Sequence, residues 1–177
     1  MSAWDWDRAA RRLGADRDGR FNTARVPLAH GRALVWRRED GSVTVLSGDE
    51  LHERGRRAAA VLRSAGVRRG DRVAGLMGRR PEAFSVPLGT WQLGAVYVPL
   101  FSGFRTDALR IRLSDSGAVA IVTGPTNRRS LASVEEDRTV ALVAVCRPMG
   151  SSRSMISLRS DVQMAGMPRR RCPIRPR

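Results

Sequence analysis

The sequence predicts an α/β fold in which parallel strands alternate with helices. Short apolar runs, rich in Val, Ile and Ala, are separated by stretches with helical spacing; the runs are 72–77, 95–100, 118–123 and 139–145. Such alternation is typical of βαβ units with helices on both faces of the sheet. A hairpin pattern precedes the runs and an aperiodic basic segment follows them, so we also expect a front hairpin and a disordered tail.

The segments before the first parallel strand predict a helix and a hairpin. Residues 4–13 have the pattern of an amphipathic helix within an N-terminal extension, 1–20. The runs 33–37 and 42–46 alternate between apolar and polar residues, and Asp40-Gly41 lies between them. Glycine supplies the positive φ that a hairpin turn needs, so these runs are expected to pair.

A helix over 48–65 is the clearest local prediction. Ser47 and Glu50 have the spacing of a capping box, in which each side chain bonds to the other residue's backbone N–H. Apolar and small residues then recur at helical spacing, and Gly66 follows as a C-terminal stop.

The remaining helices lie between the predicted strands. Pro81 favours a helix start at 81–93, and Pro87 inside that helix predicts a kink. Thr106 is a candidate cap for a helix over 107–115, with Asp107 near its positive end.

The pattern stops after Val145, so we assign 21–145 to the domain and 146–177 to a low-order tail. The tail holds eight arginines and one acidic residue, Asp161. The segment is either a disordered basic tail or a frame-shifted end. The second alternative arises because out-of-frame translation of a GC-rich gene yields Arg/Pro/Ser-rich sequence of this kind. We favour the second alternative.

Composition narrows the class of protein. A chain of 177 residues has the size of one domain, and no apolar run reaches the ~18 residues that span a bilayer. The N-terminus has acidic residues where a signal peptide would be basic, so a cytoplasmic protein without membrane contact is expected. The two cysteines, Cys146 and Cys172, form no CxxC pair, and the two histidines add no zinc-site pattern.

The net charge of +15 raises the question of nucleic-acid binding. All 32 basic residues are arginine, which indicates GC-rich codon usage more than selection for phosphate contacts. No aromatic residues interleave with the arginines to form a stacking platform. We therefore do not expect a nucleic-acid partner. A non-catalytic, arginine-rich protein that binds nucleic acid or another polyanion is the alternative function, and steeply salt-dependent binding would be its signature.

The order and spacing of several motifs resemble the N-terminal lobe of AMP-forming acyl-CoA synthetases, the acyl-adenylating enzymes. The motifs are Ser47-Gly48-Asp49-Glu50-Leu51, Gly70-Asp71-Arg72-Val73, Arg80-Pro81-Glu82, Leu93-Gly94-Ala95-Val96-Tyr97-Val98-Pro99-Leu100-Phe101 and Asp115-Ser116-Gly117-Ala118. The resemblance covers about residues 20–145.

The resemblance implies an acid–thiol ligase. Such enzymes use ATP and Mg²⁺ to convert a small carboxylic acid to an acyl-adenylate, and coenzyme A then displaces AMP; fatty acid metabolism is the implied setting. Here the family's Thr/Ser/Gly-rich phosphate loop is absent, and the chain contains no lysine. No catalytic residue or metal ligand is therefore assigned, and we expect a truncated, inactive fragment of the enzyme.

Two positions are candidates for coenzyme A contacts by resemblance. Gly103 matches a loop whose backbone approaches the coenzyme A nucleotide, and Arg128 matches an arginine near the same phosphate. The plainer interpretations are a turn glycine and a solvated arginine. Trp91 and Tyr97 are acyl-pocket candidates but fit core positions better. The acyl substrate and the oligomeric state stay undetermined.

Overall fold

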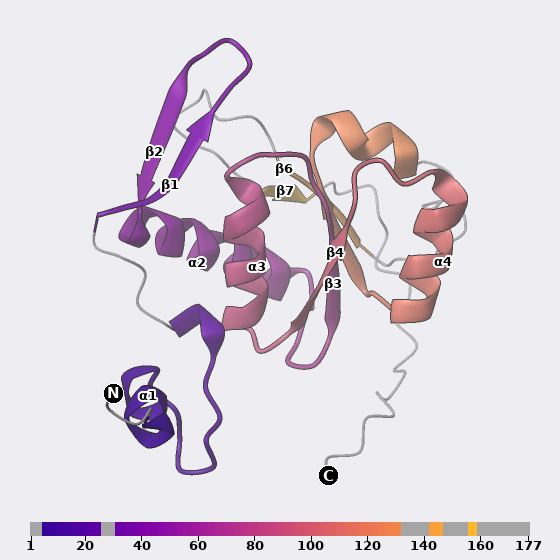
Figure 1. The fold of residues 1–177 in the computed structure, drawn as a ribbon. Helices are drawn as coiled ribbons and strands as arrows, with labels where there is room; N and C mark the ends of the chain where they lie inside the picture. Colours follow the sequence, from indigo (N-terminus) through magenta and orange to yellow (C-terminus); the bar gives the residue numbers. More distant parts are fainter. Residues whose placement is uncertain (1–4, 26–30, 132–141, 147–155, 159–177) are drawn as a thin grey trace.

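A five-stranded sheet forms the centre of the molecule (Figure 1). The computed structural model describes residues 5–25, 31–131, 142–146 and 156–158. The strand order is β4-β3-β5-β6-β7. β4, β3, β5 and β6 are mutually parallel, whereas β7 pairs antiparallel with β6. The bounds are β3 (Arg72–Leu76), β4 (Val96–Leu100), β5 (Ala120–Thr123), β6 (Leu142–Cys146) and β7 (Ile156–Leu158).

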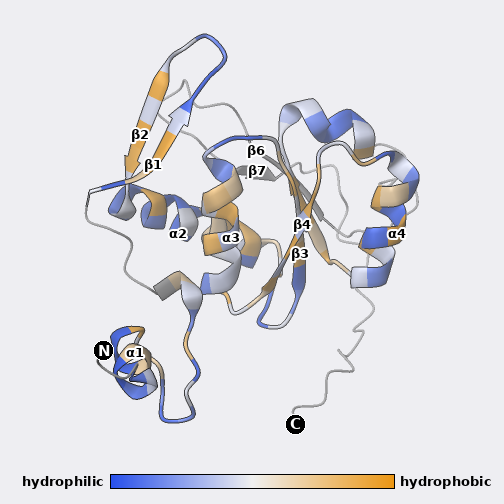
Figure 2. Ribbon diagram, in the orientation of Figure 1, coloured by the Kyte–Doolittle hydropathy of each residue, from blue (hydrophilic) through white to orange (hydrophobic). Residues whose placement is uncertain are grey.

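Helices cover both faces of this sheet, as the alternating pattern predicts. α2 (Gly48–Ser64) and α3 (Glu82–Gln92) pack on one face, and α4 (Thr106–Ser116) with the 3₁₀ helix η2 (Pro125–Leu131) on the other (Figure 1). All four residues of β5 are buried, as a strand covered on both faces requires. Figure 2 shows hydrophobic residues along the central strands β3 and β4, and both hydrophobic and hydrophilic residues in the helices around them.

Each face has its own cluster of buried residues. Beneath α2 and α3 the cluster is Leu62, Val67, Val73, Val86, Ala95, Ala120 and Val122. Beneath α4 and η2 it is Ala74, Leu76, Leu100, Leu109, Leu113, Ala118, Ile121 and Leu131.

Two glycines let α2 and α3 approach closely. A Cβ on Gly89 would lie 2.6 Å from the carbonyl oxygen of Gly55 and 2.7 Å from Cβ of Ala58. A Cβ on Gly55 would lie 3.1 Å from Cβ of Leu88. The glycines that weaken these helices by intrinsic propensity are therefore explained by packing.

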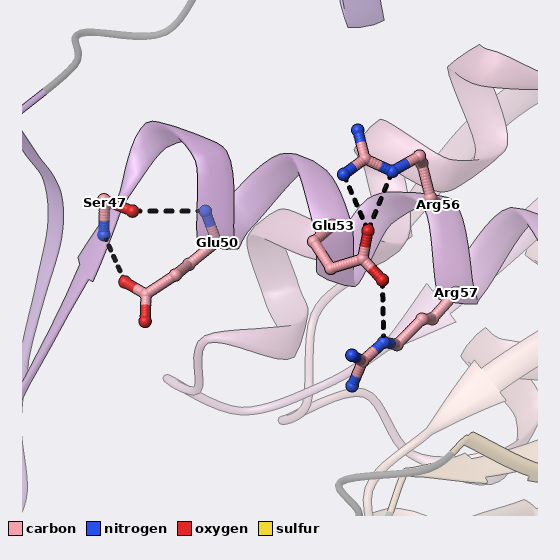
Figure 3. A network of polar contacts seen from close by, with 5 residues as sticks. All are labelled: Ser47, Glu50, Glu53, Arg56 and Arg57. Carbon is pink, nitrogen blue, oxygen red and sulfur yellow. Dashed lines mark hydrogen bonds and ion pairs between the residues drawn. The ribbon is translucent and has the colours of Figure 1, made fainter.

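The predicted capping box starts α2. The Ser47 Oγ accepts a hydrogen bond from the Glu50 backbone N–H at 3.2 Å, and the Ser47 N–H donates to the Glu50 carboxylate at 2.8 Å (Figure 3). One turn further on, the Glu53 carboxylate accepts from Arg56 and Arg57 (Figure 3). The helix thus begins where its sequence predicts, with an exposed charge network on its outer side.

The hairpin consists of β1 (Arg32–Arg37) and β2 (Val43–Ser47), paired antiparallel. Gly41 adopts a φ of 81° in the turn, as predicted. Leu34 and Leu46 pack toward the body. The Trp36 indole N–H donates to the carbonyl oxygen of Arg79 at 2.8 Å, which links the hairpin to the connection after β3.

The N-terminal residues form α1 (Trp6–Arg12) and the short 3₁₀ helix η1 (Thr23–Arg25). α1 has no buried residue and lies apart from the layered body (Figure 1). Asn22 attaches the following segment to α3, because its side-chain amide donates to the carbonyl oxygen of Trp91 at 2.6 Å.

Some local predictions were wrong. Arg105, not Thr106, is the N-cap of α4, no side chain caps that end, and Thr106 is the first helical residue. Strand β7 and helix η2 were not predicted. The helix predicted around Pro87 is present, since α3 continues through this residue, and the kink there stays a prediction. The predicted strand residues 139–141 and most of 146–177 lie outside the described residues.

Candidate functional site

The strand order creates a switch point between β3 and β5. After β3 the chain forms β4 on one side, then returns across β3 to form β5 on the other side, and continues to β6. The connections that leave β3 and β5 therefore run in opposite directions. In open parallel sheets this arrangement opens a crevice beyond the carboxyl ends of the two strands, where ligands bind.

Among the residues that the structure describes, three connections lie at this carboxyl edge, and their charged side chains are all positive. They are residues 77–81 after β3, 101–105 after β4 and 124–131 after β5. These segments contain five arginines and no acidic residue: Arg79, Arg80, Arg105, Arg128 and Arg129. At the opposite edge, residues 65–71, 93–95 and 117–119 contain only two arginines, together with Asp71. The carboxyl edge is therefore the more favourable side for an anion.

Side-chain hydrogen bonds link the last residue of β3 to the end of β5 and to the start of η2. The Thr123 hydroxyl, fully buried, donates to the carbonyl oxygen of Leu76 at 2.9 Å. The Asn127 side-chain amide donates to the same oxygen at 3.3 Å. These contacts fix the start of η2 against the end of β3, so the loops on the two sides of the switch point hold one geometry.

An ion pair between a half-buried arginine and a buried glutamate follows β3 at the same carboxyl edge. The Arg80 Nε donates to Oε2 of Glu82 at 3.2 Å, and the two side chains are 20% and 8% exposed. The other Glu82 oxygen, Oε1, is buried and has no hydrogen-bond partner within the part of the chain that the structure describes. A Cβ placed on Gly124 would lie 3.5 Å from Nη1 of Arg80, so the guanidinium reaches from the β3 side to the β5 loop.

Gly103 lies in the connection after β4, at the carboxyl edge, and is exposed. Its backbone does not require glycine. A Cβ at this position would lie 2.6 Å from Cε1 of Phe101, whose ring is exposed and would have to move aside. Phe101 and Phe104 pack edge to face at 5.7 Å, and the Arg112 guanidinium lies 4.1 Å above the Phe104 ring. The loop is thus shaped by an aromatic pair on either side of Gly103.

Arg128 lies in η2, after β5, and is half-buried. Gly103 and Arg128 consequently occupy the same edge of the sheet, on loops that follow β4 and β5. β3 lies between those strands. Neighbouring strands are about 4.8 Å apart, so a ligand that contacts both loops must extend about 10 Å across the end of β3.

Trp91 and Tyr97 occupy packing positions, as their plainer interpretation predicts. Trp91 packs against the cluster of Ala24, Leu46, Leu51 and Leu88. Tyr97 packs against the cluster beneath α2 and α3, and its ring lies over Gly75.

Sequence reasoning missed Arg80 and Glu82 as members of this edge. Their position in the sequence could have indicated this. They follow the apolar run 72–77 closely, just as Gly103 and Arg128 follow the runs 95–100 and 118–123. Because parallel strands share a carboxyl edge, that position would have placed all four residues on one side of the sheet.

The described residues contain no group of three or more His, Cys, Asp and Glu side chains that could hold a metal ion. The arginine-rich carboxyl edge has the charge and the planar donor groups that suit the phosphates of a nucleotide. In the same part of the chain, no helix has the length and apolar character needed to cross a bilayer.

The sequence matches a protein-family model described as AMP-binding enzyme over residues 24–168. The acetyl-coenzyme A synthetase of Chlorobaculum tepidum is 36% identical over 97 residues, which cover 55% of this chain and 15% of that protein. The 3-hydroxypropionyl-coenzyme A synthetase of Sulfurisphaera tokodaii is 34% identical over 108 residues, which cover 61% of this chain and 16% of that protein. The chain thus spans only a small part of the length of these relatives.

Solved structures give the same likeness. The crystal structure of a Brucella canis acyl-CoA synthetase superposes with a TM-score of 0.74 at 31% identity, covering 93% of this chain and 32% of that chain. Apo MatB from Rhodopseudomonas palustris superposes with a TM-score of 0.58 at 28% identity, covering 80% of this chain and 25% of that chain.

Proposed function

The chain belongs to the family of AMP-binding enzymes, and from this premise we propose that it forms part of the N-terminal lobe of an acid–thiol ligase. The complete enzyme would use ATP to activate a small carboxylic acid as an acyl-adenylate and transfer the acyl group to coenzyme A. The relatives with acetyl- and 3-hydroxypropionyl-coenzyme A synthetase names support short acids as substrates. Fatty acid metabolism and a cytoplasmic location belong to the same proposal.

The role we assign to this part of the enzyme is to bind the nucleotide of coenzyme A. The observation that carries it is the concentration of arginines along the carboxyl edge, beside a switch point. Gly103 would let the ligand approach the β4 loop closely, and Arg128 would pair with a phosphate through its planar fork of donors.

ATP and Mg²⁺ would be held by other parts of the polypeptide. The 177 residues include no lysine to stabilise charge at the attacking carboxylate. They also lack a Thr/Ser/Gly-rich phosphate loop. The nearest polar run, Thr123-Gly124-Pro125-Thr126-Asn127, forms the end of β5 and the start of η2 instead. We therefore propose that this chain contributes no step of adenylate formation by itself.

A titration with coenzyme A tests the proposed function. We expect saturable but weak binding, because the chain supplies only one side of the site. Changing Arg128→Gln removes the guanidinium and should weaken binding about tenfold, since a hydrogen bond to a charged group contributes about 1.5–3 kcal/mol. Amide chemical shifts recorded by NMR during the titration measure both affinities.

Arg63→Gln is the matched control, because Arg63 is exposed in the last turn of α2, at the amino edge of the sheet. It removes the same charge and should leave the affinity unchanged. Equal losses for the two variants would mean that coenzyme A senses only the net charge of the protein, and the assigned site would be wrong.

Nucleic acid is not a partner in this proposal. The arginines that gather at one place line the end of a parallel sheet, which is a small-ligand position, and the aromatic residues beside them pack against one another or the core.

The boundaries of the lobe stay predictions. We propose that it begins near residue 21; the family match starts at residue 24 and ends at residue 168. Reading the gene after codon 145 in all three frames distinguishes a native basic tail from a misjoined one.

A further inference from the structure

We propose that Arg80, oriented by Glu82, is an additional phosphate-binding residue at the switch point and contacts the nucleotide between Gly103 and Arg128. The inference rests on the proposed function for the identity of the nucleotide. It concerns a residue that lies in one of the motifs of the resemblance, Arg80-Pro81-Glu82, but to which the resemblance assigns no contact.

The strand order places the loop after β3 between the two predicted contacts. β3 lies between β4 and β5, so any ligand that touches the loops after β4 and β5 passes over the loop after β3. That loop is Met77 to Pro81, and Arg80 is the member whose guanidinium extends toward Gly124 at the start of the β5 loop. Arg80 therefore lies on the path between the two predicted contacts.

The ion pair holds Arg80 in this direction. Glu82 binds the Nε atom of the guanidinium through Oε2, which leaves the orientation of the planar group fixed. A fixed fork loses less conformational entropy when it binds a phosphate than a solvated arginine does. Glu82 is thus a positioning residue, and Arg80 is the group that meets the ligand.

The unsatisfied carboxylate supports a functional reason for the pair. Glu82 is 8% exposed, and its Oε1 has no hydrogen-bond partner among the described residues. A buried charge that is only partly satisfied costs stability, and apolar residues of similar size would be at least as stable there. Such a pair is expected where it serves binding and not where it serves folding alone.

The test uses adenosine 3′,5′-bisphosphate, which carries phosphates on a nucleoside without the thiol arm. Affinity is measured by NMR titration of the wild-type chain, Arg80→Gln, Arg128→Gln and the control Arg63→Gln. The glutamine at 80 can still donate to Glu82, so the fold is protected while the guanidinium is lost. We expect Arg80→Gln to weaken binding about tenfold and Arg63→Gln to leave it unchanged.

Two further variants separate positioning from folding. Glu82→Gln keeps an acceptor for the Arg80 Nε–H and should bind at least as tightly as the wild type, whereas Glu82→Leu should bind more weakly. The double variant Arg80→Leu/Glu82→Leu removes the buried pair as a unit, so it should keep the thermal midpoint and still lose affinity.

Each outcome bears on one of the two proposals. Loss in Arg128→Gln without loss in Arg80→Gln overturns the role of Arg80 and leaves the proposed function intact. Loss in Arg80→Gln alone supports Arg80 and removes Arg128 from the site. No saturable binding by the wild-type chain overturns both. Unchanged affinity in the folded double variant also overturns the role of Arg80.

Discussion

At the scale of single residues, Gly75 decides how Tyr97 lies on the sheet. A Cβ at position 75, in the central strand β3, would lie 2.5 Å from Cζ of Tyr97, so the tyrosine ring would have to move. We predict that Gly75→Ala destabilises the protein by about 1–3 kcal/mol, the usual cost of overpacking. Urea unfolding measures the change.

Two variants test the cause of that loss. Gly78→Ala adds the same methyl group where nothing lies within 4 Å, and should be nearly neutral. Combining Gly75→Ala with Tyr97→Leu should cost less than the sum of the single changes, because the ring that meets the methyl group is gone. Strict additivity of the pair would contradict the packing explanation.

Individual residues were predictable where a motif or a special backbone angle marks them. Ser47, Glu50 and Gly41 perform the roles that their spacing predicts. Arg80 and Glu82 were not predictable from local pattern, because the feature that matters is the neighbour that each strand acquires in the sheet. Gly103 and Arg128 came from a resemblance, and their ligand contacts remain predictions.

At the scale of elements, the capping box of α2 makes a pH-dependent contribution. The backbone N–H of Ser47 donates to the Glu50 carboxylate, and this bond, followed by the one with the Ser47 side chain, lowers the pKa of Glu50 from its ordinary value of 4.5. The folded pKa lies below the unfolded one. The contribution is therefore present above the unfolded pKa and is lost as the pH falls through the folded pKa.

We predict that Glu50→Ala lowers the thermal midpoint at neutral pH, and that the difference from the wild type disappears in strong acid. Asp49→Ala removes a charge from the same helical turn without breaking the box, so its effect at neutral pH should be smaller. Calorimetry at both pH values measures the two differences. A Glu50→Ala deficit that persists undiminished in acid would show that the charged hydrogen bond is not its source.

Elements were predictable to within about two residues where periodicity and end signals coincide. The hairpin, α2, α3, α4 and the parallel strands all appear where the pattern places them. The start of α4 was assigned to the wrong residue because Thr106 has the chemistry of a cap but adopts the first helical position. β7 was not predicted because a three-residue strand is too short to display alternation. It forms by pairing antiparallel with β6, which the local sequence does not indicate.

At the scale of the whole molecule, the α/β class follows from the alternation of runs, but the strand order does not. The sequence orders the strands β3, β4, β5, whereas the sheet places β3 in the middle. Right-handed crossovers and burial on both faces limit the choices. The return across β3 is what places the arginine-bearing loops side by side.

The residue content of the whole chain also determines whether it is expected to react with ATP. Adenylate formation needs charge neutralisation at the phosphates and at the attacking carboxylate, which such enzymes obtain from a metal ion, a phosphate loop and a lysine. This sequence has no lysine, and its described residues contain no metal-binding cluster. We therefore predict that the purified chain with ATP, Mg²⁺ and acetate or longer acids releases no pyrophosphate above the blank. A complete acetyl-coenzyme A synthetase in the same assay is the positive control. Acid-dependent release by this chain would mean that arginines replace the missing groups, and that the carboxyl edge is a catalytic site and not only a binding surface.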